Sequence, residues 1–480
     1  MQFEKLKEVR ATVDAVLSKR QPWLDEWELI ANVLLPYAVQ IKGKRGSEWR
    51  AVRKDQAIVN DYPSRAIEDL SAGLMARITS PARKWFGLQV TDQGTSAAND
   101  AVDQPGKEYL DRMSAIIGSD LSGGGWYAAL SMSTYLDMAA FGTACIFVDE
   151  QPDGSVVYDP VPIGRFAIDV NHLGKVDTYV REWSATAQQI VKRFGRKNIS
   201  HRVEQALKQH DHKTEFDIIH AVLPLEKPNR KGQRWESVWF EQAETDNTKV
   251  LSEGGYFEFP ALCPRWGVRP GDVYGRGPGD KARGNIRMLQ HYTRGMVLML
   301  DRVIDPPKAV IGGNADLSFL PGAVTHVSAM NGAQVAVEDL LKITPENFTV
   351  CVNFIEKLER DIGDAFFAPL WRMFTDEDRS DISATEIEAR RQEAALRAGP
   401  LLESLNGELL EPAVEMRIAM LMRQGRLIDM PESLARVNIK VEFISIMHQV
   451  QQATALNGIR ALIADVQGLA AIAPEAIDHL

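Results

Sequence analysis

Residues 379–426 have the sequence RSDISATEIEARRQEAALRAGPLLESLNGELLEPAVEMRIAMLMRQGR, the stretch that says most about the fold. Near its start, Ser383-Ala-Thr-Glu386 matches a capping box, in which serine and glutamate side chains satisfy the first amides of a helix. Apolar residues then recur every three or four positions, which indicates a helix. Gly399-Pro400 and Glu411-Pro412 interrupt it, because proline lacks an amide donor and clashes with the preceding turn. We therefore predict one long helix over 383–426 with two kinks, which suits a ring subunit better than a compact enzyme.

Just before this stretch, the apolar spacing predicts two more long helices, at residues 280–302 and 344–370. Each would be roughly 33–39 Å long at about 1.5 Å per residue. The first ends at Pro306-Pro307, and the second begins with the cap Thr344 followed by Pro345. The residues between them are rich in glycine and β-branched side chains and nearly uncharged. The sequence thus predicts an arm of two helices with a β-rich tip.

The first 279 residues mix helical and strand patterns. Helical spacing covers residues 3–35, which Pro22 should divide into two helices, and also 62–79 and 126–140. From Thr143 onward the apolar period becomes two, which is typical of strands. The strands are expected at 146–148, 156–158, 166–168, 178–180, 216–223, 235–240 and 255–259, with a helix at 187–194. This order predicts an α+β fold and not the alternating units of a nucleotide-binding parallel sheet.

Composition excludes several classes of protein. The chain has 480 residues and a net charge of −10, so it needs more than one core and is a poor candidate for gripping DNA phosphates. Its three cysteines lie far apart without a C-x-x-C pair, which favours neither zinc nor a disulfide framework. Residues 121–148 carry one charge, Asp137, but their glycines and serines disfavour a membrane span. We expect a soluble protein.

No catalytic constellation is apparent in the sequence. Gly275-Arg-Gly-Pro-Gly279 lacks the spacing of a phosphate-binding loop, and a turn leading into a helix explains it better. The histidines form no H-E-x-x-H pattern, and the acidic residues 376–378 lack calcium-loop spacing. No G-x-S-x-G nucleophile elbow occurs. We expect no enzyme, cofactor or metal.

The chain resembles the portal, or head-to-tail connector, proteins of short-tailed double-stranded DNA phages (podovirus type). The matching groups run nearly end to end in the order of that family. They are Trp27 with Leu35-Pro36; Ala72-Gly73-Leu74-Met75 with Ser80-Pro81 and Trp85-Phe86; Phe141-Gly142-Thr143-Ala144; Tyr274-Gly275-Arg276-Gly277-Pro278-Gly279; and, in the long helix, Ser383-Ala384-Thr385-Glu386, Arg390, Glu393, Gly399-Pro400, Glu408-Leu409-Leu410, Pro412, Leu421, Arg423 and Gly425.

The resemblance implies a portal-type α+β subunit of an oligomeric ring, with two antiparallel stem helices. Its parts would be the wing (1–279), stem helix 1 (280–302), the β-rich clip (303–343), stem helix 2 (344–370), the tunnel loop (371–382), the long kinked wing helix (383–426), and a wing strand with the start of a crown (427–480).

The resemblance also implies a function. Twelve copies would form the DNA channel at one capsid vertex of the virion, for genome packaging, retention and ejection, after assembly in the host cytoplasm. Partners would be double-stranded DNA, the terminase large subunit, the major capsid or scaffolding protein and a tail adaptor, with no membrane. Two alternatives stay open: another non-enzymatic head–tail adaptor or tail-tube ring, and a nucleic-acid enzyme, which the missing motifs disfavour.

Site residues follow from the same resemblance. The DNA-facing candidates are Arg372 and Arg379 in the tunnel loop, although such a pair could instead stabilise a helix boundary or meet a neighbouring subunit. The channel-facing acidic candidates are Glu356, Glu359 and Asp364, a pattern that a solvated helix face would also give. The candidates for partner docking at the clip are Gly312, Gly313, Asn314 and His326.

Replacing both Arg372 and Arg379 by alanine should leave assembly intact and weaken retention of packaged DNA. Phosphate contacts are independent of sequence and sensitive to salt, so the loss should depend on ionic strength. Measuring DNA retained by particles at low and high salt tests this. Equal retention by parent and variant at both salts would make the arginines structural.

Overall fold

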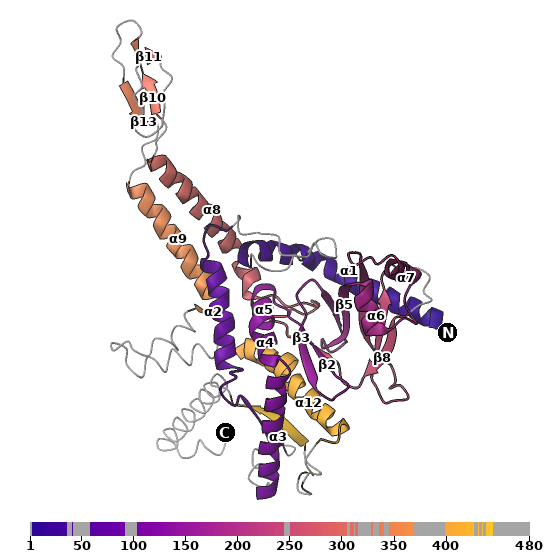
Figure 1. Ribbon diagram of the computed structural model, residues 1–480. Coiled ribbons are helices and arrows are strands. Elements are labelled where there is room, and N and C mark those ends of the chain that lie inside the picture. The colour runs from indigo at the N-terminus through magenta and orange to yellow at the C-terminus, as the bar shows by residue number, and fades with distance from the viewer. Residues whose placement is uncertain are drawn as a thin grey trace, which may run out of the picture.

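The computed structural model describes residues 2–35, 41, 58–91, 103–243, 250–304, 308–311, 313–314, 328–329, 336–339, 345–368, 399–426, 431, 434 and 438–444. Helices and antiparallel sheets form a body from which a two-helix arm projects (Figure 1). The predicted α+β class is confirmed.

The first helix, α1 (Gln2–Leu34), is continuous through Pro22, so the predicted division into two helices is wrong. Pro22 and Ser18, whose carbonyl loses its amide donor, are both exposed, and water can satisfy that carbonyl. Buried residues hold the helix on both sides of the proline. Arg20 donates to Glu182 (2.7 Å) and to the carbonyl of Gly164 (3.0 Å).

The body contains a five-stranded antiparallel sheet covered on both faces. Its strand order is β4 (Phe166–Val170), β5 (Val176–Thr186), β6 (Glu215–Pro224), β7 (Trp235–Glu241) and β8 (Ser252–Tyr256). Apolar residues of the first half of α1 pack on one face. On the other face pack α6 (Ala187–Phe194) and α7 (His201–Lys208). Adjacent residues of β6 show the alternation, because Ile219 faces α1 and Ile218 faces α6 and α7.

The sheet agrees with most of the sequence prediction. Helix 187–194 is confirmed at its predicted ends, whereas the last strand lies at 252–256 and not at 255–259. Helix α7 had no counterpart in the prediction.

The remaining body elements are mostly helical. The helices are α2 (Tyr62–Arg77), α3 (Gln104–Gly123), α4 (Trp126–Ala129), η4 (Leu130–Thr134) and α5 (Tyr135–Phe141). A three-stranded sheet has the order β3 (Val156–Pro160), β2 (Ile146–Glu150), β9 (Ala261–Leu262). A two-stranded sheet pairs β1 (Phe86–Thr91) with β14 (Asn438–Phe443). The predicted helix over 126–140 is present, with a π-helical turn at its centre. Residues 121–148 form a largely buried helix and strand, and none of the described helices is long and apolar enough to cross a membrane.

The described part of the long helix runs from 399 to 423. It contains a π-helical turn, η5 (Asn406–Leu410), followed directly by α12 (Glu411–Arg423). Pro412 has no amide to give the preceding turn, and the π turn just before it is where the helix accommodates that loss. Gly425 follows the helix with φ of +64°, a left-handed conformation that favours glycine. The capping box at 383–386 lies outside the described residues.

The arm consists of α8 (Pro278–Ile304) and α9 (Pro345–Ala365), which lie side by side in Figure 1. At its far end are two antiparallel strand pairs, β10 (Lys308–Ile311) with β13 (Ala336–Asp339) and β11 (Gly313–Asn314) with β12 (Ser328–Ala329). Helices lie where the apolar spacing predicted them, although α8 extends two residues beyond its predicted bounds at each end and α9 ends at Ala365 and not at 370.

Glycines hold the base of the arm against the body. The turn before α8 packs backbone to backbone on the end of α5, so that a Cβ at Gly277 would lie 2.7 Å from the carbonyl oxygens of Met138 and Ala139. Gly142, with φ of +79°, faces this turn and accepts a hydrogen bond from the amide of Trp266 (2.8 Å). The glycine-rich motif is therefore a close-packed turn leading into a helix, as predicted.

Aromatic rings and a hydroxyl complete this contact, which we call the arm root (residues 138–143 and 274–279). Tyr274 is fully buried, with its ring 5.1 Å from Trp27, and its hydroxyl accepts the amide of Ile168 (3.2 Å). Thr143 accepts the amide of Gly275 (2.9 Å). Three groups of residues that carry the family resemblance thus meet at one place.

Gly277→Ala should destabilise the protein by about 1–3 kcal/mol, because the added methyl group overpacks a rigid backbone contact. The matched control is Gly284→Ala on α8, where the methyl group meets open space. That control should be neutral or stabilising by up to about 1 kcal/mol. Thermal or denaturant unfolding measures both, and equal stability of the two variants would contradict the role of the arm root.

Candidate functional site

The inner half of the arm is closed by its own chain. Ile286 and Leu289 of α8 and Leu358 and Ile362 of α9 are at most 2% exposed. A polar substitution at Ile362 would therefore disturb the fold of the single chain. Such a variant cannot test whether the arms of two copies contact each other. Positions that can test such a contact lie farther from the body, on the outer half of the arm.

A polar clamp fixes both arm helices to the chain just before α2. The side chain of Gln290 accepts the amides of Val59 (2.8 Å) and Asn60 (3.0 Å) and donates to the carbonyl of Asn60 (2.7 Å). Asn60 in turn donates to Glu359 on α9 (2.9 Å). The clamp joins α8 and α9 through a third segment, which makes the direction of the arm a property of the body.

The outer half of the arm exposes apolar side chains. Residues 296–300 of α8 read Met-Val-Leu-Met-Leu, and five successive residues of a helix point to every side of it. A single antiparallel neighbour covers only one side. Accordingly Val297 is 45% exposed, Leu298 53% and Leu300 38%, and Val350 of α9 is 66% exposed. A helix that is apolar all round is normally buried, so this surface is a candidate contact for a further partner.

The two arm helices also carry opposite charge. Helix α8 has five basic and two acidic side chains, whereas α9 has five acidic and two basic ones. A second arm placed alongside could therefore bring its α9 against α8 with complementary charge as well as apolar contact.

The structure places some of the predicted site residues. Glu356 and Asp364 are exposed on α9, and Glu359 is half-buried and bonded to Asn60. Gly313 and Asn314 form β11. Gly312, His326, Arg372 and Arg379 lie outside the described residues.

One buried ion pair beside the arm root was not expected from the sequence. Arg265, 4% exposed, binds the carboxylate of Glu408 through its guanidinium and through its own amide (2.8 Å). The same guanidinium donates to the carbonyls of Gly174 (2.7 Å) and Val273 (3.1 Å). Glu408 lies in the π turn of the long helix, so this pair connects that helix to the segment leading into the arm. The acidic residue of the Glu-Leu-Leu group was its only signal in the sequence.

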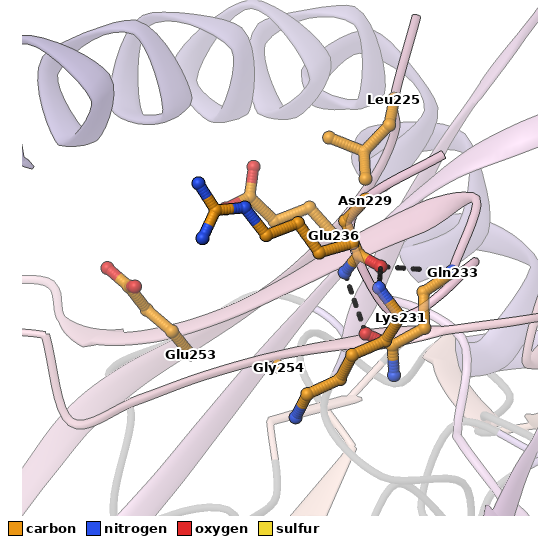
Figure 2. A pocket seen from close by; sticks show the side chains of 8 residues that line it. Leu225, Asn229, Lys231, Gln233, Glu236, Glu253 and Gly254 are labelled. Atoms are coloured by element: carbon orange, nitrogen blue, oxygen red, sulfur yellow. Dashed lines mark hydrogen bonds between the residues drawn. The ribbon is translucent and has the colours of Figure 1, made fainter. Parts of the chain in front are cut away.

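Several hollows lie on the surface of the described residues. One, of about 380 Å³, lies on the β6–β7 loop, where Figure 2 shows Lys231, Glu236 and Glu253 around an open polar rim. Its walls are braced by hydrogen bonds of Asn229, to Gln233 (2.8 Å) and from the amide of Lys231 (2.9 Å). Among the described residues, no three His, Cys, Asp or Glu side chains gather as metal ligands would.

Burial shifts the pKa values of an acidic and a basic side chain in the body, Asp137 and His220. Burial raises the pKa of Asp137 to about 7, against the opposing effect of hydrogen bonds from Ser133 and the backbone of Ile163. Burial, with Arg181 and Arg193 nearby, holds the pKa of His220 well below its usual range, so it stays neutral. His220 stacks on Trp239 at 3.9 Å, a packing arrangement that explains its burial without a catalytic role.

Comparison with known proteins gives consistent matches. A family model described as bacteriophage head to tail connecting protein matches residues 6–480. A probable portal protein of Bordetella phage BPP-1 is 31% identical over 473 residues, which cover 96% of this chain and 82% of that protein. The portal protein of Salmonella phage epsilon15 is 30% identical over 437 residues, covering 89% and 77%.

Similarity to solved structures is more distant. A chain from the virion of a native gene transfer agent particle and one from the neck of an empty particle each share 12% identity, with TM-scores of 0.36 and 0.34. Each match covers 76% of this chain, and 86% and 85% of the respective chains. These scores are too low to support an inference.

Leu298→Asp should leave the fold of the single chain unchanged and abolish the ring assembly that the family resemblance predicts. The side chain is half exposed in one copy, but at a contact between arms the charge would be buried without a partner, at a cost of several kcal/mol. The matched control is Leu173→Asp, 70% exposed in the turn between β4 and β5. Native mass spectrometry of both variants tests the idea, and normal assembly of Leu298→Asp would remove the arm surface from the interface.

Proposed function

The chain belongs to the bacteriophage head-to-tail connecting proteins and serves as a portal protein at a capsid vertex, and we propose that its arms pack side by side to form the DNA channel of a ring. The observation that carries this proposal is the apolar run 296–300, which one chain leaves partly exposed, with Leu298 about half exposed. In a ring every arm has two neighbours, so both flanks of the run can be buried. Fully burying an exposed leucine side chain contributes about 1.5–3 kcal/mol, and a half-exposed one about half of that, at every contact.

Charge supports the same arrangement. With α8 of one copy against α9 of the next, basic and acidic side chains alternate around the ring. Exposed acids that stay unpaired, such as Glu356 and Asp364, would give the channel wall a negative charge. DNA would then slide without adhering, because the wall repels its phosphates. The family resemblance implies twelve copies.

The remaining partners follow from the ends of the arm and body. The strand pairs at the tip are short and antiparallel, and we propose that they dock the packaging motor, the terminase large subunit, and later the tail adaptor. The body would contact the major capsid or scaffolding protein. The ring would assemble in the host cytoplasm before entering the virion.

We propose no catalytic activity for this chain, in keeping with a family whose members are structural in general. A different head–tail adaptor ring is the main competing function, and it would assemble without admitting the packaging motor. Nuclease or ATPase activity that persists through purification would instead favour a nucleic-acid enzyme.

Deleting residues 312–330 from the tip should abolish binding of the packaging motor while the ring still forms. The arm contacts that hold the ring lie on α8 and α9, outside the deletion. Native mass reports the ring, and co-sedimentation with purified terminase large subunit reports docking. Motor binding that survives in an intact ring would place the docking surface elsewhere.

A further inference from the structure

A compact part of this acidic chain is strongly basic. Residues 187–214, which contain α6 and α7 and are called the α6–α7 unit here, carry seven basic and two acidic side chains, while the whole chain has a net charge of −10. The basic residues are Lys192, Arg193, Arg196, Lys197, Arg202, Lys208 and Lys213.

Because α6 and α7 pack on the sheet with their apolar sides, their basic side chains face solvent. Ile190 of α6 and Val203 of α7 are buried against the sheet, and Ser200 caps α7 by accepting the amide of Val203 (3.2 Å). Every one of the seven basic residues is exposed. The apolar side of the unit therefore packs against the sheet, and its outer side is a basic surface.

Little of this charge is neutralised within the chain. Among the ion pairs of the described residues, Arg202 lies 3.9 Å from Glu241 and Lys208 lies 2.8 Å from Glu204, and the other five basic residues have no carboxylate partner. Asp211 is occupied in its own loop, where it accepts the amides of Lys213 (2.8 Å) and Thr214 (3.0 Å).

Arg193 is held in a fixed position. Its guanidinium lies 4.5 Å from the ring centre of Trp239 and 5.3 Å from that of Trp183. Such stacking orients the cation over the sheet at little further entropic cost on binding.

We propose that the outer surface of the α6–α7 unit binds the phosphate backbone of double-stranded DNA, as a contact separate from the channel. Two short helices with mixed lysine and arginine suit sequence-independent phosphate contacts. An acidic protein partner would be expected to need an apolar anchor as well, and the described residues expose no large hydrophobic side chain between 187 and 214. In Figure 1 the unit lies at the opposite end of the body from the arm, so DNA bound there is outside any channel that the arms form.

The test uses a covalently closed DNA minicircle, which has no end to thread through a channel. The variant is Lys192→Gln, Arg196→Gln and Lys197→Gln together. Its matched control, with the same two lysines and one arginine changed to glutamine, is Lys227→Gln, Arg230→Gln and Lys231→Gln in the exposed β6–β7 loop. Binding of the full chain is measured between about 50 and 200 mM salt, with unfolding curves to confirm that both variants are folded.

We expect the α6–α7 variant to bind the minicircle at least tenfold more weakly at the lower salt. Its plot of log affinity against log salt should be flatter by about 3, since each lost phosphate contact contributes roughly 0.9 to the slope. The control should behave like the parent. Equal binding by both variants would overturn the proposal, as would a parent that binds poly-glutamate through these residues but not the minicircle. Neither result depends on ring formation, so failure here is distinguishable from failure of the arm contact.

Discussion

The arm is attached to the body by a close backbone contact, the arm root, where glycines of the turn before α8 meet the end of α5. No side chain larger than hydrogen fits at Gly277 without displacing the carbonyls of Met138 and Ala139. The ring of Tyr274 closes the contact against Trp27, and the pair Arg265–Glu408 ties the long helix to the same place. The base of the arm is thereby fixed against the helices and sheets of the body.

A rigid arm root determines where the exposed apolar surface on the outer half of the arm lies relative to the body. An arm that swung freely could fold its apolar residues back onto its own body. Held by Gln290 and the arm root, it presents Leu298 and Val350 at a constant distance and angle. A closed assembly needs this constancy, because any error in angle is repeated at every subunit. The glycines of the arm root, which act within one chain, would thereby support the proposed contacts between chains.

Local signals in the sequence were sufficient for the arm and for much of the five-stranded sheet. Helices α6, α8 and α9 follow from periodicity and capping residues, which act over a few neighbours. Errors arose where distant packing overrides a local signal. Pro22 breaks isolated helices, yet α1 continues through it because Arg20 is anchored to Glu182, which is remote in sequence. Likewise, the pairing of β1 with β14 joins residues near 90 and 440, and no local pattern announces it.

The candidate site, too, could be predicted from the sequence only in part. Apolar spacing and the family resemblance predicted the arm and its acidic helix. Only the structure shows that Leu298 is exposed and that Ile362 is buried. The central claim is that outer arm halves contact one another in a ring. Electron cryo-microscopy of the purified chain viewed end-on tests it most directly. We expect a closed ring whose arms touch along residues 296–300 around an axial opening. A ring in which those residues face solvent, or a monomer, would contradict the claim.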